Sequence, residues 1–268
     1  MKYFTDQMGR SIALSVFPPR RIVSLVPSQT ELLSDLGLEA AVVGITKFCV
    51  HPPAWFQHKK RVGGTKTVNL QKVADLAPDL IIGNKEENEQ EQIDALSAQF
   101  PVWMSDIRTL SEACAMIRET GALTGSAATA TEIADEIERR FANNRPHAGA
   151  RQPKVAYLIW RKPYMVAAGE TFIDAMLVQA GFVNAFGHKN RYPEILPEDL
   201  IAAQPDVLLL SSEPYPFAEK HIDAFRSICP AAQIRVVDGE LFSWYGSRLL
   251  QAPDYFRQLR ESLLSALK

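Results

Sequence analysis

The stretch PDLIIGNKEE (residues 78–87) decides the fold, because the chain repeats it as PDVLLLSSEP at residues 205–214. In both copies a Pro-Asp pair precedes a short apolar run, and a glutamate, Glu86 or Glu213, lies seven positions after the aspartate. Proline cannot extend a helix, so each pair predicts the end of a helix and the start of a buried strand. The repetition therefore predicts two related α/β lobes.

Strand-like and helix-like segments alternate before residue 109 and again after residue 150. Gly37 and Gly181 each follow a stretch with apolar residues at helical spacing, as expected of residues that end a helix. Alternation of this kind is typical of parallel sheets joined by right-handed crossovers. The region between contains two helical stretches without a strand, and the second runs to about twenty residues, or about 30 Å.

We therefore predict an α/β fold in which two Rossmann-like lobes are joined by one long helix, with a ligand cleft between the lobes. The predicted parts are an N-terminal α/β lobe at residues 1–108, a linking helical region at 109–150 and a C-terminal α/β lobe at 151–268.

The composition is that of an ordinary globular protein, with 268 residues, 47% hydrophobic and 22% charged. A net charge of −2 lacks the basic surplus of nucleic-acid binders, so we expect no nucleic-acid partner. Cys49, Cys114 and Cys229 form no zinc-binding pattern and are expected to be free buried thiols, with a Cys49–Cys229 bridge as the alternative. The sequence shows no long apolar run and no export signal, so a soluble chain is expected.

The two repeated glutamates fall three or four residues beyond predicted strands. In open parallel sheets, functional residues lie beyond the carboxyl ends of the strands. We therefore expect the side chains of Glu86 and Glu213 to project from the rims of their lobes. Acid–base chemistry needs two carboxylates within a few ångströms, whereas equivalent positions on separate lobes suit docking onto a two-fold symmetric partner. The alternative is that Pro-Asp merely ends a helix and starts a strand.

Five stretches, spread between residues 21 and 217, carry a family resemblance: RIVSLVPSQTELLSDLGL, VVGITKFCVHPPAW, VGGTKTVNLQKVADLAPDLII, WRKPYMVAAGETFIDAMLVQAGFVNAFG and ILPEDLIAAQPDVLLLSSEPYPF. The sequence resembles the helical-backbone substrate-binding proteins of ABC importers for vitamin B12, haem and iron–siderophores, and the vitamin B12-binding proteins most of all. It departs from the vitamin B12 pattern at Thr65 and Lys66, where a tryptophan is expected.

The resemblance implies a monomer that captures a corrinoid or similar metal chelate and delivers it to an ABC permease dimer in the membrane. It implies one docking glutamate per lobe, at Glu86 and Glu213, with Glu87 and Glu89 as alternatives in the first lobe. It implies no intrinsic cofactor and a periplasmic or extracytoplasmic location. Haem and iron–siderophores are alternative ligands. A cytoplasmic sensor or scavenger is the alternative function, because the sequence shows no export signal.

Large flat ligands are held by aromatic faces and a few polar anchors, which we expect on the loops that follow strands. The predicted ligand-binding residues are Phe48, His51 and Lys66 in the first lobe and Trp160, Tyr164, Trp244, Tyr245 and Arg248 in the second. Burial is least expected on loops, which favours Trp244 and Tyr245. We expect Arg248 to pair with either an anionic ligand group or a neighbouring carboxylate. Trp55 and Trp103 are expected to be packed.

An enzyme would have to use Ser28 and His51 as nucleophile and base. The sequence contains no G-x-S-x-G elbow, P-loop or G-x-G-x-x-G motif, so we predict no enzymatic activity and no catalytic residues. The five histidines are scattered, so no directly bound metal is predicted.

Overall fold

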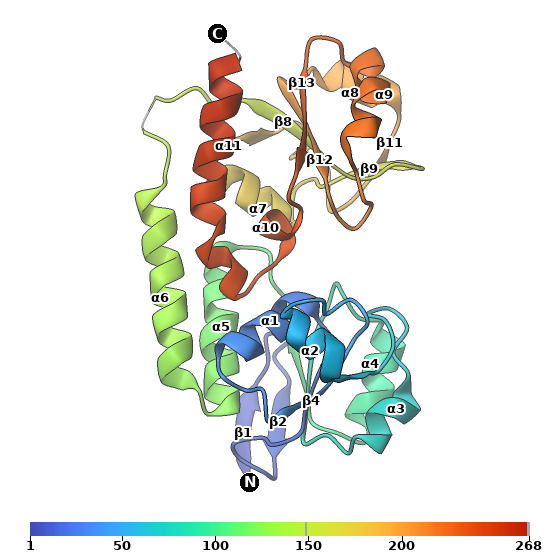
Figure 1. The fold of residues 1–268 in the computed structure, drawn as a ribbon, viewed down its shortest axis with the longest axis vertical. Coiled ribbons are helices and arrows are strands. Elements are labelled where there is room, and N and C mark those ends of the chain that lie inside the picture. The colour runs from blue at the N-terminus through green and yellow to red at the C-terminus, as the bar shows by residue number, and fades with distance from the viewer. Residues whose placement is uncertain (148, 267–268) are drawn as a thin grey trace. The chain divides into compact units, whose positions relative to one another are not determined.

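The computed structural model describes residues 1–147 and 149–266 and divides the chain into two compact units (Figure 1). Unit 1 comprises Met1–Ile107, Ser111–Glu138 and Tyr245–Arg248, and unit 2 comprises Arg108–Leu110, Arg139–Trp244 and Leu249–Lys268. None of the described helices is both long and apolar enough to cross a membrane.

Unit 1 is built on a five-stranded parallel sheet in the order β5-β4-β3-β6-β7. A separate antiparallel hairpin, β1–β2, precedes it. The elements up to residue 107 are β1 (Lys2–Thr5), β2 (Ser11–Leu14), β3 (Ile22–Ser24), α1 (Pro27–Asp35), β4 (Val42–Ile45), α2 (Pro53–His58), β5 (Lys60–Arg61), α3 (Leu70–Asp75), β6 (Leu80–Asn84), α4 (Gln90–Ser97) and β7 (Val102–Ser105).

Two long helices follow the sheet of unit 1, α5 (Leu110–Thr124) and α6 (Ala127–Asn143), and α6 continues into unit 2. They pack side by side (Figure 1), and at Gly121 an added Cβ would lie 2.2 Å from the Ala130 Cβ. Arg118 of α5 pairs with Asp135 and Glu138 of α6. The predicted linking region thus contains two antiparallel helices fixed by a close backbone approach and a surface ion-pair cluster.

Unit 2 contains a six-stranded sheet in the order β11-β9-β8-β12-β13, with β10 also paired to β8. Its elements are β8 (Lys154–Trp160), β9 (Tyr164–Val166), α7 (Phe172–Gln179), β10 (Val183–Asn184), β11 (Glu194–Ile195), α8 (Pro197–Ala203), β12 (Val207–Ser211), the 3₁₀ turn η1 (Glu219–His221), α9 (Ile222–Ile228), β13 (Gln233–Val237), α10 (Glu240–Ser243), the 3₁₀ turn η2 (Ser247–Leu250), which begins in unit 1, and α11 (Ala252–Ala266).

The sheet of unit 2 is mixed, whereas the alternation of strands and helices predicted a parallel sheet. β9 runs antiparallel to β8, and β11 runs antiparallel to β9. Only residues 161–163 separate β8 from β9, whereas a parallel crossover needs a dozen or more residues. The short connection therefore forces a hairpin, while β8, β10, β12 and β13 keep the parallel arrangement.

The two Pro-Asp stretches fold alike, and the aspartate is the reason that both begin a strand. The backbone N–H of Asp79 donates to the Arg21 carbonyl (3.0 Å), and its carboxylate accepts from the Arg21 backbone N–H (2.9 Å). The backbone N–H of Asp206 donates to the Lys154 carbonyl (2.8 Å), and its carboxylate accepts from the Lys154 N–H (2.7 Å). Each aspartate thus ties its strand to the start of the neighbouring one.

The residue before each Pro-Asp pair is also equivalent, because Ala77 (φ 41°) and Gln204 (φ 46°) both take left-handed backbone. Left-handed backbone ends the preceding helix. Gly37 (φ 74°) and Gly181 (φ 82°) end α1 and α7 in the same way, which confirms both predicted helix ends.

Candidate functional site

The loop after β6 places three predicted or alternative docking glutamates at the carboxyl end of the unit 1 sheet. The Asn84 Oδ1 accepts from the backbone N–H groups of Glu86 (2.8 Å) and Glu87 (3.1 Å). The Asn88 Oδ1 accepts from the Asn84 N–H (2.9 Å), and its Nδ2 donates to the Thr65 carbonyl (3.0 Å). Two buried asparagines therefore fix the backbone of this loop, and Glu86 follows the strand by two residues rather than three or four.

Lys66 joins the same loop from the neighbouring segment. Its Nζ donates to the Glu86 carbonyl oxygen (2.7 Å) and lies 3.3 Å from the Glu89 Oε1, with both side chains more than half exposed. Lys66 therefore has a structural partner, and its role as a ligand-binding residue stays a prediction. Its charge also acts on Glu87.

Burial raises the pKa of Glu87, the nearby Lys66 lowers it, and the adjacent Glu86 raises it again. Desolvation is the largest of these effects, because a charged carboxylate is disfavoured away from water. Glu86 and Glu87 are both half-buried, while Glu89 is exposed. The charged form of Glu87 is therefore disfavoured by its surroundings.

The loop after β4 carries Phe48 and His51. The Phe48 ring is 50% exposed, and the Lys47 Nζ lies 5.0 Å from its centroid. His51 is half-buried and precedes Pro52. An exposed phenylalanine at a strand end has the geometry needed to contact a flat ligand.

Cys49 lies buried in this loop, and its Sγ is 3.0 Å from the Thr30 Oγ1 and 3.1 Å from the Thr46 Oγ1. Burial raises the pKa of the Cys49 thiol, so it is protonated and unreactive at neutral pH. Cys114 and Cys229 are also free and buried, as predicted. Ser28 is buried too, which does not suit a nucleophile that must meet a substrate.

Arg248 lies in unit 1, as does Tyr245, whereas the sequence predicted both in the second lobe. The Arg248 Nε and Nη2 donate to the two carboxylate oxygens of Glu31 on α1, at 2.8 and 2.6 Å. Gly246 allows this approach, because an added Cβ would lie 2.9 Å from the Ser28 carbonyl oxygen. Two partners were predicted for Arg248, an anionic ligand group or a neighbouring carboxylate. The structure shows a carboxylate, that of Glu31.

In unit 2, Glu213 follows β12 by two residues, as Glu86 follows β6. Its Oε1 accepts from the Ser243 Oγ (2.5 Å) and from the Trp244 Nε1 (3.0 Å). Glu213 is half-buried, so its carboxylate does not project freely as the sequence analysis expected. Two donors on a distant segment hold it in place.

Trp244 and Tyr245 are buried, at 7% and 5% exposure, although a loop position favoured exposure. The bond to Glu213 anchors Trp244 in unit 2, and Tyr245 begins the segment that packs on α1 of unit 1. Their ligand-binding role stays a prediction. Trp55 and Trp103 are also buried, which confirms that both are packed.

Trp160 and Tyr164 flank the turn between β8 and β9. Trp160 is 38% exposed, and its ring meets that of Tyr215 edge-on, with centroids 5.6 Å apart. The half-buried Tyr164 ring packs on Phe225 at 5.2 Å, on the side of the unit 2 core. Trp160 is therefore the more accessible of the two predicted aromatic residues.

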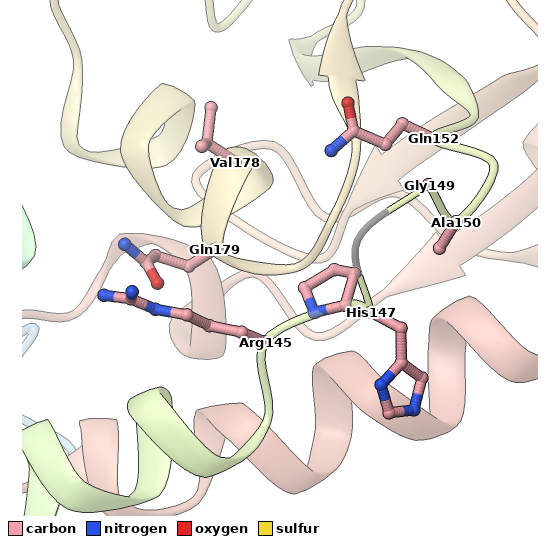
Figure 2. A pocket seen from close by; sticks show the side chains of 8 residues that line it. Arg145, His147, Gly149, Ala150, Gln152, Val178 and Gln179 are labelled. Atoms are coloured by element: carbon pink, nitrogen blue, oxygen red, sulfur yellow. The ribbon is translucent and has the colours of Figure 1, made fainter.

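Two hollows in the structure involve none of the predicted ligand-binding residues. One, of about 550 Å³, is lined by residues 145–147, 149, 150 and 152 and by Val178 and Gln179 of α7. Figure 2 shows the Arg145 and Gln179 side chains extending in the same direction, while His147 points away from them. The other, of about 260 Å³, lies in unit 1 beside Met8, Lys85 and Met104. Within the described part of the chain, no cluster of three or more His, Cys, Asp or Glu is arranged to hold a metal ion.

Sequence reasoning missed Asn84, Asn88 and Tyr215. The two asparagines had a visible signal, since polar residues four apart end and follow a buried strand. Tyr215 lay within a quoted motif, next to Pro214, but only the tertiary structure brings it to Trp160.

Comparison with known proteins matches residues 22–228 to the family described as periplasmic binding protein. The chain is 26% identical over 204 residues to the vitamin B12-binding protein of Vibrio cholerae serotype O1, covering 75% of this chain and 74% of that protein. Among solved structures, the periplasmic heme-binding protein RhuT from Roseiflexus sp. RS-1 is 26% identical with a TM-score of 0.80, covering 93% and 99% of the two chains. The vitamin B12 binding protein BtuF of Vibrio cholerae shares the fold, with a TM-score of 0.80 at 23% identity over 92% and 98%.

Proposed function

Since the chain belongs to the periplasmic binding protein family, we propose that it captures a corrinoid or similar metal chelate and delivers it to an ABC importer. The observation that carries this proposal is the family match, which spans residues 22–228 and thus most of both units. The family and the fold are those of solute-binding proteins rather than enzymes.

The ligand class follows from the relatives and from the accessible aromatic residues. Similar proteins are named for binding vitamin B12 and heme, which are both large conjugated metal chelates. Phe48 in unit 1 and Trp160 in unit 2 are partly exposed at strand ends, where they offer flat faces to such a ligand. We propose that both contact it, together with the other residues predicted from the sequence. No resident cofactor is part of this proposal, because the chelate is cargo.

Equilibrium dialysis against cyanocobalamin, cobinamide, haemin and a ferric siderophore tests the capture step. We expect saturable binding of one molecule per chain, read by visible absorbance, for at least one of the four. Phe48→Ala and Trp160→Ala should each weaken that binding about tenfold, since aromatic contacts dominate such sites. Failure of the wild-type protein to retain any of them would contradict the proposal.

We further propose an extracytoplasmic location and a monomer that docks onto a dimeric permease through Glu86 and Glu213. These two glutamates occupy equivalent positions after β6 and β12, which suits a partner that is itself two-fold symmetric.

Transport assays with matched variants test the docking role. Glu86→Ala and Glu213→Gln should leave ligand affinity within about twofold and reduce delivery at least about tenfold, because a lost interfacial charge acts on association. Glutamine is chosen at 213 because its amide oxygen can still accept from Ser243 and Trp244. Glu91→Ala and Glu219→Ala, at exposed glutamates of each unit, are the controls and should transport normally. Unchanged delivery by both docking variants would refute the role.

A further inference from the structure

Tyr157 in β8 is a fully buried tyrosine whose hydroxyl reaches the carboxyl end of the neighbouring strand β12. It pairs in register with Leu209, and Ser211 lies on the same face of the sheet because side chains two residues apart in a strand point the same way. The Tyr157 hydroxyl donates to the Ser211 Oγ at 3.1 Å, two positions before Glu213. Burial raises the pKa of Tyr157, so this donor stays protonated at neutral pH.

The Ser211 hydroxyl carries this contact on to the backbone of Glu213. Its Oγ donates to the Glu213 carbonyl oxygen at 2.5 Å and accepts from the Glu213 backbone N–H at 3.4 Å. A serine hydroxyl has a single proton to donate, and with that proton on Glu213 it can only accept from Tyr157. The direction of each hydrogen bond is therefore fixed, and one side chain holds both backbone polar groups of Glu213.

The Tyr157 ring also supports the segment that holds the Glu213 carboxylate. It packs on the fully buried ring of Phe242 in α10, with centroids 5.1 Å apart. Phe242 is followed directly by Ser243 and Trp244, which donate to the Glu213 Oε1 at 2.5 and 3.0 Å. Tyr157 thus contacts both groups of neighbours that hold Glu213, those on its backbone and those on its carboxylate.

Gly239 completes the surroundings of Glu213. An added Cβ at Gly239 would lie 2.7 Å from the Glu213 Cγ and 3.1 Å from its backbone nitrogen, so only glycine lets the loop after β13 approach this closely. The Gly239 N–H donates to the Ser212 Oγ at 2.9 Å, which keeps the loop in place. The backbone, the Cγ and the carboxylate of Glu213 therefore all have close neighbours, and much of the conformational freedom of this side chain is lost on folding.

We propose that Tyr157 is a positioning residue for docking, which holds Glu213 in one conformation before the permease arrives. This inference rests on the proposed docking role of Glu213 and adds the buried residue that prepares it. A cation of the permease then meets a carboxylate whose direction is already set, so less conformational freedom is lost on association. Without the Tyr157 hydroxyl, the Ser211 hydroxyl can turn away from the Glu213 carbonyl, and Glu213 samples more conformations.

The affinity of the protein for its permease, reconstituted in lipid nanodiscs and measured without any chelate, tests this role. Tyr157→Phe keeps the ring on Phe242 and removes only the hydroxyl, so the Kd should rise about fivefold, a change typical of one hydrogen bond. Ser211→Ala removes both links to Glu213 and should raise the Kd at least as much. Tyr255→Phe, which removes a hydroxyl that accepts from the Asp238 backbone N–H at 3.0 Å, is the matched control in the same unit and should bind as wild type.

A double-mutant cycle with Glu213→Gln separates positioning from a general effect on the fold. If Tyr157 acts through Glu213, adding Tyr157→Phe to the Glu213→Gln protein should change the Kd less than about twofold. A fivefold loss in both backgrounds would overturn the inference. Wild-type affinity of Tyr157→Phe, when Glu213→Gln binds at least about tenfold more weakly, would also overturn it and leave the docking role standing. Equal affinity of the wild-type and Glu213→Gln proteins would remove the docking role, and this inference with it.

Solvent exchange of the Trp244 indole N–H, followed by proton NMR, reports on the Glu213 carboxylate without any partner. The resonance is assigned as the one that Trp244→Phe lacks. In Tyr157→Phe its exchange should be about fivefold faster, because its acceptor is held less firmly. The Trp160 indole, which donates to the Lys162 carbonyl in the same unit, should be unchanged. An unchanged Trp244 rate, or an equal change at Trp160, would overturn the proposal.

Discussion

The ends of β6 in unit 1 and β12 in unit 2 share a backbone frame but use their side chains differently. Both strands start from an anchoring aspartate and both are followed two residues later by a half-buried glutamate. After β6, the loop backbone is held by Asn84 and Asn88. After β12, the Glu213 carboxylate itself is held by Ser243 and Trp244. A repeated backbone therefore does not fix what its side chains contact.

One strand residue accounts for much of this difference. Gly83 in β6 corresponds to Leu210 in β12, which is buried in the core of unit 2. An added Cβ at Gly83 would lie 2.6 Å from the Met104 Sδ and 2.9 Å from the Asn88 Oδ1. The glycine thus makes room for the asparagine that folds back onto β6.

The largest effect on the free energy of unfolding is expected from a substitution that makes β6 of unit 1 resemble β12 of unit 2. Gly83→Leu is expected to lower the free energy of unfolding by about 3 kcal/mol, because the side chain must displace Met104 and Asn88. Gly83→Ala should cost less, about 1–2 kcal/mol. Urea denaturation measures both changes. If Gly83→Leu is tolerated without loss, the two strand ends are interchangeable and the comparison fails.

Removing the aspartate anchors should affect both units to a similar degree. Asp79→Ala and Asp206→Ala are each expected to lower the free energy of unfolding by about 2 kcal/mol, since backbone N–H groups lose a charged acceptor. Arg151→Gln, which breaks the partly exposed 3.0 Å ion pair to Asp206, should cost less than about 0.5 kcal/mol. Thermal and urea unfolding report both values. A loss confined to one aspartate would contradict the equivalence of the two anchors.

Glu87 gives unit 1 an ionisable side chain at a position where unit 2 has Pro214. The contribution of this position to stability should therefore depend on pH in unit 1 alone. Since burial raises the pKa of Glu87 in the folded state, its ionisation opposes folding above its unfolded pKa. Glu87→Gln should therefore stabilise the protein at neutral pH, and the gain should disappear as the pH falls below the unfolded value. Unfolding measured across this pH range provides the check, and a gain that grows on acidification would contradict it.

The smallest effects concern the left-handed residues before each Pro-Asp pair. Ala77→Gly and Gln204→Gly should each stabilise the protein by about 0.5 kcal/mol, because glycine adopts positive φ without steric strain. Ala202→Gly, at an exposed helical position of α8, is the control and should cost about 1 kcal/mol. Differential scanning calorimetry resolves such shifts. Destabilisation by both glycines would show that this backbone is not strained.

Much of the fold could be predicted from the sequence, because local physical rules determine it. The Pro-Asp pairs, the apolar runs and the glycines at 37 and 181 predict helix ends and buried strands from backbone sterics and hydrophobic burial alone. The sequence also predicted that the three cysteines are free and that Trp55 and Trp103 are packed, and the structure confirms both predictions. The mixed sheet of unit 2 was missed, although the three-residue connection after β8 contained the reason.

The site could be predicted only as a set of residue types near strand ends. Phe48 and Trp160 are accessible as expected, while Arg248 pairs with Glu31 and the buried Trp244 donates to Glu213. Arg248 and Glu31 are 217 positions apart, a separation that no local pattern spans. The sequence by itself determined where helices and strands begin and end, since short-range sterics and periodicity decide that. Only the tertiary structure decided which charged and aromatic groups are already engaged, because their partners come from distant segments.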